Sequence, residues 1–482
     1  MGGPLSADAR QSILAAPAVG ALDGQGSPDV VAATIDGELY AWRSDGSLRP
    51  GFPVHMNYEN CAPELRDEDH RYDCGFGAAP TLVDMDGDGS LEILQPGMDQ
   101  WLYLWDADGV AVPGWPVKVQ DPSFEAVANR EGRILSSPAV GDIDGDGGME
   151  IVLGTGQTAG SDFGGYGVLY ALDTDGSLLD GWPITLFAGF AGALPVIGEG
   201  IVVSPALADV DGDGDLEIGA NSTADQGALY HHDGTVAVDF AATRQDFGPY
   251  ATTDEQAVLL MLSPGAFADG DGDDVPDYFA AGTSLSYGAN ILAWATLFDH
   301  DHALVGYSSA VDEDGRGYPL PGFPRQIEDL PLFSSTAAAD LDGDGNSEVV
   351  FASTLVARAW NSNGVPANGF PMFHGGWVLG GPALGDIDGD GYRDMVFASR
   401  EGYVFAWRSD GHADDSGEWL MMGHDAQRTG NYNLPVPDQQ GPSLEEAEQS
   451  CAVVGASRVG SGALLLLCAL PPLLRRRRRV IV

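Results

Sequence analysis

An acidic segment of nine residues, repeated along almost the whole chain, constrains the fold more than any other feature. Six copies follow the pattern D-x-D-G-D-G-x-x-D/E (the second Gly is Asp in one of them) and begin at Asp84, Asp142, Asp209, Asp269, Asp340 and Asp386. A seventh, degenerate copy begins at Ala21 and keeps only two acids of the pattern, Asp23 and Asp29. Successive copies start 46 to 71 residues apart, so one repeated module accounts for residues 1–434.

Each module has the sequence pattern of short strands separated by tight turns. Apolar runs lie before and after the acidic segment, and a third run leads into an Asp-Gly turn, as in residues 168–172 before Asp173–Gly176. A Gly-aromatic-Pro element then follows in five modules, at Gly51–Pro53, Gly114–Pro116, Gly181–Pro183, Gly322–Pro324 and Gly369–Pro371.

Such modules favour one all-β architecture. A single sheet of about four strands cannot bury both faces, whereas radial stacking of such sheets buries them and leaves only short edges. We therefore predict a seven-bladed β-propeller of four-stranded antiparallel blades over residues 1–434. A β-solenoid is the alternative, although its repeats are usually much shorter.

The acidic segments have the chemistry of a calcium loop. Carboxylates stand at positions 1, 3, 5 and 9, position 7 offers a backbone carbonyl, and glycines at positions 4 and 6 let the chain curl around an ion. Calcium takes about six to eight oxygen ligands on flexible loops, whereas magnesium needs a stricter octahedron. Without Cys or His, the segments disfavour zinc and copper.

We predict about six Ca²⁺ ions on this basis. The predicted ligands are Asp84, Asp86, Asp88, Ser90, Glu92, Asp142, Asp144, Asp146, Gly148, Glu150, Asp209, Asp211, Asp213, Asp215, Glu217, Asp269, Asp271, Asp273, Val275, Asp277, Asp340, Asp342, Asp344, Asn346, Glu348, Asp386, Asp388, Asp390, Tyr392 and Asp394. The degenerate segment is predicted to bind weakly or not at all, because Ala21 and Gln25 replace two acids. Asp274 replaces the second glycine of the segment from Asp269, which leaves that register open.

The repeat resembles the FG-GAP (VCBS-type) repeat of integrin α-subunit propellers and of many bacterial secreted proteins. The acidic segments between short strands carry this resemblance, together with Phe76–Pro80 before Asp84. It covers about residues 10–434 and implies calcium-binding loops and a ligand-binding face. Four segments depart from the integrin pattern, with Glu in place of Asp at position 9. The stretch Gly423–Gly430 is similar to the end of related bacterial repeat proteins, and we interpret His424 as structural.

The cysteines and the C-terminus favour a place outside the cytoplasm. Cys61 and Cys74 flank a polar insert, and we predict a disulfide worth ~3 kcal/mol there, with two free thiols as the alternative. Residues 435–450 are predicted to form a disordered linker. Residues 451–482 are predicted to form a sorting or membrane-anchor segment with an apolar helix, because the apolar run 459–474 ends at five arginines.

The tail also resembles the MYXO-CTERM class of C-terminal sorting signals. Ser450 and Cys451, then the apolar run and the arginine cluster carry the resemblance, which implies processing or lipidation at Cys451. The first twenty residues lack the basic and apolar regions of a signal peptide, so we expect the native start to lie upstream. The resulting expectation is an extracellular or outer-surface protein, membrane-anchored through the tail or released after processing.

Catalytic motifs are missing from the sequence. It contains no G-x-S-x-G elbow, H-E-x-x-H pair or P-loop, and a net charge of −50 excludes nucleic acid as a partner. We interpret His231 and His232 as packing residues in the strand position of Ala171 and Leu172, with Asp299–His302 as an alternative metal or acid–base site.

We therefore expect a monomeric, non-catalytic scaffold that binds an extracellular protein or glycan in an adhesion or matrix role. The alternatives are a lyase-type polysaccharide enzyme built on a propeller and a purely structural envelope component. The sequence does not identify the ligand.

Overall fold

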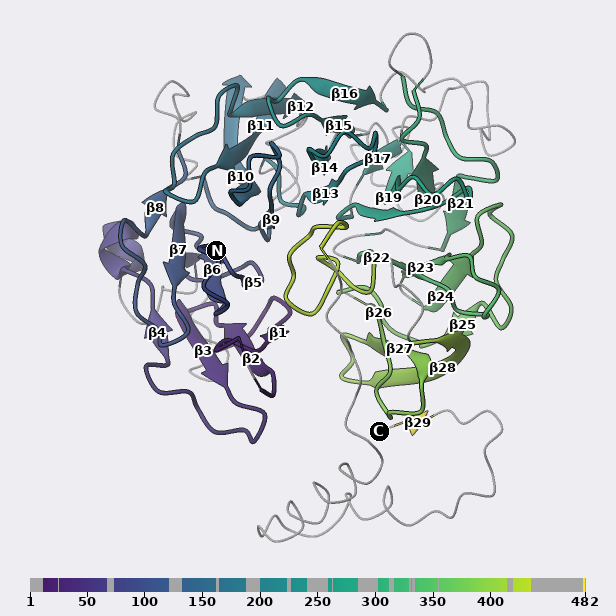
Figure 1. Ribbon diagram of the computed structural model, residues 1–482, viewed down its shortest axis with the longest axis horizontal. Helices are drawn as coiled ribbons and strands as arrows, with labels where there is room; N and C mark the ends of the chain where they lie inside the picture. Colours follow the sequence, from purple (N-terminus) through teal and green to yellow (C-terminus); the bar gives the residue numbers. More distant parts are fainter. Residues whose placement is uncertain are drawn as a thin grey trace, which may run out of the picture.

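Seven antiparallel sheets are arranged radially around a common centre (Figure 1). This is a computed structural model, and it describes residues 12–24, 26–66, 73–120, 132–161, 164–187, 200–222, 227–240, 259–261, 263–284, 302–311, 316–328, 331, 334–353, 355–378, 380–413, 419–434 and 480–481. The prediction of an all-β propeller with seven blades is confirmed by this arrangement.

The strands follow the chain blade by blade. Blade one holds β1 (Ala18–Gly20), β2 (Asp29–Ala33), β3 (Glu38–Trp42) and β4 (Val54–His55), and blade two holds β5 (Thr81–Val83), β6 (Glu92–Pro96), β7 (Trp101–Trp105) and β8 (Val117–Lys118). Blade three holds β9 (Ala139–Gly141), β10 (Glu150–Ser161), β11 (Gly164–Leu172) and β12 (Ile184–Phe187), and blade four holds β13 (Ala206–Ala208), β14 (Glu217–Ala220), β15 (Ala228–Tyr230) and β16 (Val236–Asp239). Blade five holds β17 (Leu259–Met261), β18 (Ala266–Ala268), β19 (Asp277–Ser284), β20 (His302–Tyr307) and β21 (Arg325–Ile327), and blade six holds β22 (Thr336–Ala339), β23 (Glu348–Ala352), β24 (Val356–Trp360) and β25 (Met372–Phe373). Blade seven holds β26 (Ala383–Gly385), β27 (Tyr392–Ala398), β28 (Val404–His412) and β29 (Val480–Ile481).

Two blades depart from the predicted pattern of four consecutive strands. Blade five has five strands, because β17 from the insert before it pairs with the far end of β19. Blade seven takes its fourth strand, β29, from residues 480–481 instead of from its own module. The rest of the predicted C-terminal helix and the predicted linker at 435–450 lie outside the described residues. Two short 3-10 helices, Tyr58–Asn60 and Pro63–Leu65, precede blade two.

The apolar core lies between neighbouring blades. Leu39 of blade one and Ile93 of blade two belong to one buried cluster, and Leu94 of blade two and Leu153 of blade three belong to the next. Both faces of an inner strand are therefore covered, which is why every residue of β9, β13 and β18 is apolar or glycine and buried.

The Gly-aromatic-Pro elements of blades one, two, three and five contact the following blade. Trp115 is buried and its indole N–H donates to the carbonyl of Thr174 in blade three at 3.2 Å. Gly51 has φ +91°, and a Cβ there would lie 1.9 Å from the carbonyl oxygen of Asp108 in blade two. Only glycine allows this close backbone approach. The element is thus an inter-blade packing device.

A segment after the seventh module, Trp419–Tyr432, runs through the centre of the ring, and we call it the closing segment (Figure 1). It hydrogen-bonds to the inner strands of six blades: to Val19, Leu82, Val140, Leu207, Ala338 and Leu384. Its Leu420 accepts from blade seven, and its Ala426 accepts from blade one. The closing segment therefore connects the first and last blades.

Buried polar contacts fix the closing segment. Asp425 is 1% exposed and accepts hydrogen bonds from the Thr429 hydroxyl at 2.6 Å and from the Thr429 backbone N–H at 3.3 Å. His424 Nδ1 lies 3.1 Å from Asp425 Oδ2, which fits the predicted structural role. The Arg428 guanidinium donates to the carbonyls of Pro17 and Met422, and burial lowers its pKa to about 10. These groups are costly to bury unless all are paired.

Replacing Trp419 tests whether the closing segment stabilises the ring. Trp419 is 1% exposed and packs against the rings of His424 and Phe267. Trp419→Ala is expected to lower the free energy of unfolding by about 3–5 kcal/mol, measured by denaturant unfolding in calcium buffer. Trp377→Ala is the control, since Trp377 is 39% exposed, and should change it by less than about 1 kcal/mol. Equal effects of the two substitutions would contradict the assigned role.

Candidate metal centre

The acidic segments form the loops between the first and second strands of each blade. The inner strands all run in the same direction along the central axis of the propeller. The loops that follow them therefore gather at one end of the propeller, which we call the acidic end. Neighbouring loops touch: the N–H of Leu91 donates to the carbonyl of Leu22, and the N–H of Leu216 donates to that of Ile143. Negative charge therefore accumulates at this end.

One hydrogen bond repeats in all seven loops and sets their register. The position 9 carboxylate accepts from the backbone N–H of position 2, as in Glu92 with Met85 at 2.9 Å and Glu150 with Ile143 at 2.8 Å. The other pairs are Asp29 with Leu22, Glu217 with Val210, Asp277 with Gly270, Glu348 with Leu341 and Asp394 with Ile387. The loop from Asp269 thus keeps the common register, and Asp274 adopts the positive φ of the glycine it replaces, at +67°.

The remaining acids hold the loop in its curved shape by accepting hydrogen bonds from its backbone N–H groups. Asp84 accepts from the N–H groups of Gly87, Asp88 and Gly89, so its two oxygens hold both glycine turns. Asp86 and Asp88 each accept from the N–H two residues later. Position 7 supplies one of these N–H groups, and the predicted role of its carbonyl as a ligand stays a prediction.

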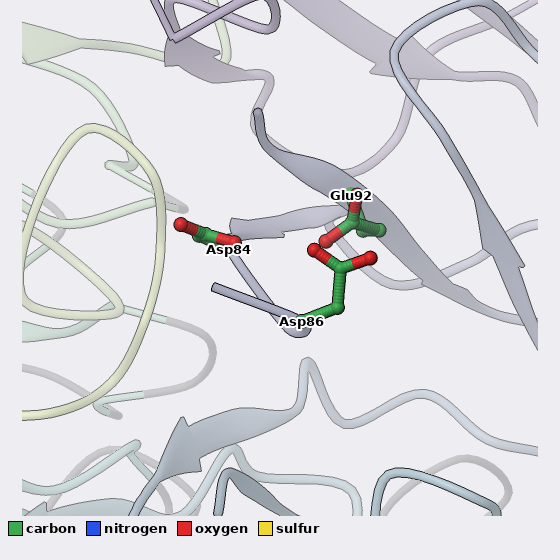
Figure 2. Close-up of side chains that lie close together, drawn as sticks. All are labelled: Asp84, Asp86 and Glu92. Atoms are coloured by element: carbon green, nitrogen blue, oxygen red, sulfur yellow. The ribbon is translucent and has the colours of Figure 1, made fainter. Parts of the chain in front are cut away.

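These contacts bring the carboxylates together. Asp84, Asp86 and Glu92 each place an oxygen within 4.8 Å of the other two, and they face one another across the loop (Figure 2). The same spacing holds for Asp142, Asp144 and Asp146, for Asp209, Asp211 and Asp213, and for Asp269, Asp271 and Asp273. Like charges about 4 Å apart repel by roughly 4 kcal/mol at an effective dielectric of about 20.

The electrostatic cost is visible in the position 9 acids. Burial, with a further contribution from the neighbouring aspartates, raises the pKa of Glu92, Glu150 and Glu348 to about 7. The same causes raise the pKa of Asp277 to about 8 and that of Asp394 to about 6. At neutral pH the four acids of a loop do not all ionise easily without a cation.

Two buried oxygens show where a cation fits. Asp142 Oδ1 and Asp342 Oδ1 are shielded from solvent and have no hydrogen-bond partner. An orphaned carboxylate oxygen is expensive unless a cation coordinates it. The surrounding donors are carboxylate oxygens, which suits a hard ion such as Ca²⁺.

The degenerate loop of blade one is neutralised by an arginine. The Arg49 guanidinium lies 2.6 Å from Asp29 Oδ2 and 3.9 Å from Asp23 Oδ2, and both Arg49 and Asp29 are buried. The charge that a metal would supply therefore comes from the protein. Arg49 was not among the predicted site residues, although the sequence carries a signal for it: the equivalent position after the Asp-Gly turn is apolar in other blades, as in Val112 and Leu179.

Side chains from β28 and from the turn after β15 reach two further loops. Arg408 Nε lies 3.2 Å from Asp390 Oδ2, and its guanidinium stacks 3.9 Å above the ring of Tyr392. His231 and His232 contact Glu217 and Asp215. The two histidines therefore lie in the turn after β15, not in the strand position that sequence comparison gave them.

Other predicted residues are placed as follows. Cys61 and Cys74 form a disulfide, with an S–S distance of 2.10 Å. His302 is buried at the start of β20, whereas residues 299–301 and Cys451 lie outside the described residues. In the part of the chain that the structure describes, no helix has the length and apolar character needed to cross a membrane.

Comparisons with known proteins find distant structural similarity only. No protein-family model matches the chain, and no curated protein matches it in sequence. Among solved structures, the biofilm matrix protein Bap1 of V. cholerae is 14% identical, covers 90% of this chain and 95% of its own, and gives a TM-score of 0.40. The Dos1 propeller is 12% identical with a TM-score of 0.45, covering 80% and 76%. A quinohemoprotein alcohol dehydrogenase from Comamonas testosteroni is 12% identical with a TM-score of 0.42, covering 84% and 75%. The fold assignment rests on the chain's own strand pairing.

Arg49→Ala tests whether the guanidinium of Arg49 neutralises the acids of loop one. The substitution leaves Asp29 buried and unpaired, so the free energy of unfolding should fall by about 3–5 kcal/mol. The exposed Arg43, six residues earlier, is the matched control, and Arg43→Ala should change it by less than about 1 kcal/mol. Denaturant unfolding in calcium buffer measures both, and an Arg49→Ala chain as stable as Arg43→Ala would refute the assignment.

Proposed function

We propose that the chain is a calcium-rigidified propeller that acts outside the cytoplasm as a non-catalytic scaffold for a protein or glycan ligand. The observation that carries the proposal is the convergence of carboxylates in the loops of blades two to seven, each loop held in the same register. The contrast with loop one strengthens it, because the loop that lost its acids gained Arg49 in their place.

The number of calcium ions follows from the individual loops. Loops two, three and six show no arginine or histidine partner for their four acids among the described ion pairs. Loop seven shares Asp390 with Arg408, and we expect weaker calcium binding there. Up to six sites, of unequal affinity, are the resulting proposal.

The end of the propeller opposite the acidic loops is proposed to bind the ligand. Topology puts there the turn between second and third strands and the connection from each blade to the next, so the long β10–β11 hairpin and the disulfide insert Cys61–Cys74 lie at this end. Exposed aromatic side chains also occur there. They are Tyr166, Phe187, Phe373, Trp377 and Tyr403. Exposed aromatic rings are typical of surfaces that bind proteins or sugars.

Two further features support the proposal. The closing segment already pairs with the inner strands of six blades, so the backbone groups at the centre are occupied by the protein itself. The second feature concerns the environment in which the protein works. The disulfide is typical of exported proteins, and calcium is plentiful outside the cytoplasm. Anchoring through the tail, with processing at Cys451, remains part of the proposal.

Removing calcium tests the metal part of the proposal. Ions that bind only the folded loops add about 2.7 kcal/mol per site at a hundredfold excess over the dissociation constant. The chelated protein should therefore melt at a much lower temperature and become sensitive to protease. Asp144→Ala should lower the melting temperature and remove one ion from a metal count. Asp23→Ala, equally exposed but in loop one, should leave the count unchanged.

A melting temperature that is insensitive to chelator would contradict calcium stabilisation. So would a count below about three calcium ions per chain by elemental analysis, since loops two, three, five and six all have a complete acidic set.

Ligand binding and the absence of catalysis are tested together. The calcium-loaded chain is screened on glycan and matrix-protein arrays, with a lyase absorbance assay on the same polysaccharides. Binding without turnover is expected, and Trp377→Ala/Tyr403→Ala should weaken it at least tenfold, whereas Tyr318→Ala, an exposed ring at the acidic end, should not. Turnover of a polysaccharide would favour the enzyme alternative, and a complete lack of binding would favour the structural one.

A further inference from the structure

The loop of blade four differs from the other acidic loops. Position 7 is Asp215, which gives this loop a fifth acid. Besides the Asp209, Asp211 and Asp213 group, it contains a second group in which oxygens of Asp211, Asp215 and Glu217 lie within 4.8 Å of one another. One loop thus presents two overlapping sets of ligand atoms.

Two imidazoles reach the second group from the turn after β15. His231 Nδ1 lies 3.1 Å from Glu217 Oε1, and His232 Nδ1 contacts Asp215 Oδ2. The turn is anchored at its base, where the N–H of His231 donates to the carbonyl of Thr235. Both side chains therefore extend over the loop from a fixed position.

The matching position in other blades serves a different purpose. Asp106 in blade two and Asn361 in blade six use their side-chain oxygens to cap their own turns, accepting from Asp108 and Asn363. In blade four the residue at this position is His231, and its side chain points to the acidic loop of the same blade instead. Packing of the blade does not require this orientation, since His231 and His232 have side chains 37% and 42% exposed.

We propose that Asp215, Glu217, His231 and His232 form a binding site for a divalent transition-metal ion, of which Zn²⁺ is the probe. Two imidazole nitrogens and two carboxylate oxygens make up a ligand set that zinc accepts with four-coordinate geometry. Calcium, by contrast, takes oxygen ligands and gains nothing from imidazole. The partial exposure of both histidines gives the ion access from solvent.

Each imidazole presents a nitrogen to a carboxylate oxygen that a shared ion would coordinate. Glu217 Oε2 is engaged by the N–H of Val210, so Oε1, beside His231, is the oxygen left for a metal. The inference rests on nitrogen ligands beside the acids of loop four, which are not found among the described contacts of loops two, three and six. Asp215 and Glu217 also belong to the predicted calcium set of loop four, so zinc is proposed to take the place of calcium in that loop.

Zinc titration of the full chain tests the site. The protein is stripped with chelator, returned to saturating Ca²⁺ and titrated with Zn²⁺ by calorimetry. One zinc ion per chain is expected, and Co²⁺ bound at the same place should show the visible absorption of a nitrogen-containing site. Replacing a residue that only hydrogen-bonds to a metal ligand typically lowers metal affinity by about 10–100-fold. Because His231→Gln/His232→Gln removes two direct ligands, it should weaken zinc binding by more than about 100-fold.

The controls separate this site from the others. His55→Gln should bind zinc like the unmodified chain, because His55 lies on β4 and contacts the carbonyl of Met56. The calcium count and melting temperature of the double variant report on folding and on the remaining loops. No zinc binding in saturating calcium, or zinc affinity unchanged in the double variant, would overturn the inference and leave His231 and His232 as ion-pair partners only.

Discussion

Repulsion between carboxylates held a few ångströms apart is the constraint on which the rest of this structure depends. The loop geometry is enforced from within: Asp84 holds both glycine turns, and Glu92 fastens the second strand to the start of the loop. The same bonds that fix each blade's first two strands therefore gather four acids around one point. Repulsion within such a loop is comparable with the net stability of a whole domain, and this is the physical reason for proposing a balancing cation.

The chain meets this requirement in more than one way. In loop one, Arg49 supplies the positive charge and a metal is unnecessary. In loop seven, Arg408 takes over part of the charge of one acid. In loop four, two imidazoles lie beside the acids and change the chemistry of the ligand set. Related loops of one fold have thus diverged in the cation they are suited to hold, by changes at positions outside the acidic segment.

Contacts between blades are the second level of the structure. Three of the five Gly-aromatic-Pro elements bring their glycine (Gly51, Gly181 and Gly322) onto the backbone of the next blade, and the closing segment pairs with six inner strands. The acidic end is therefore rigid and continuous, whereas the opposite end carries the hairpin, the disulfide insert and the exposed aromatic rings. This division of the molecule into an acidic end and a variable end is the structural basis of the proposed scaffold function.

The sequence by itself determined the repeat, the number of blades, the register of every acidic loop except the one from Asp269, and the carboxylate chemistry of the loops. These properties are local, since nine residues with fixed spacing dictate the turns and the alternation dictates the strands. Tertiary structure alone decided which cations approach the loops. Arg49 lies twenty residues from Asp29, and His231 lies fourteen residues from Glu217, so no local pattern connects them. The closing segment was likewise recognisable as a motif, but its pairing with six blades was not. Four of those contacts, at Val19, Leu82, Val140 and Leu207, join residues far apart in the chain, and they exist only once the ring has formed.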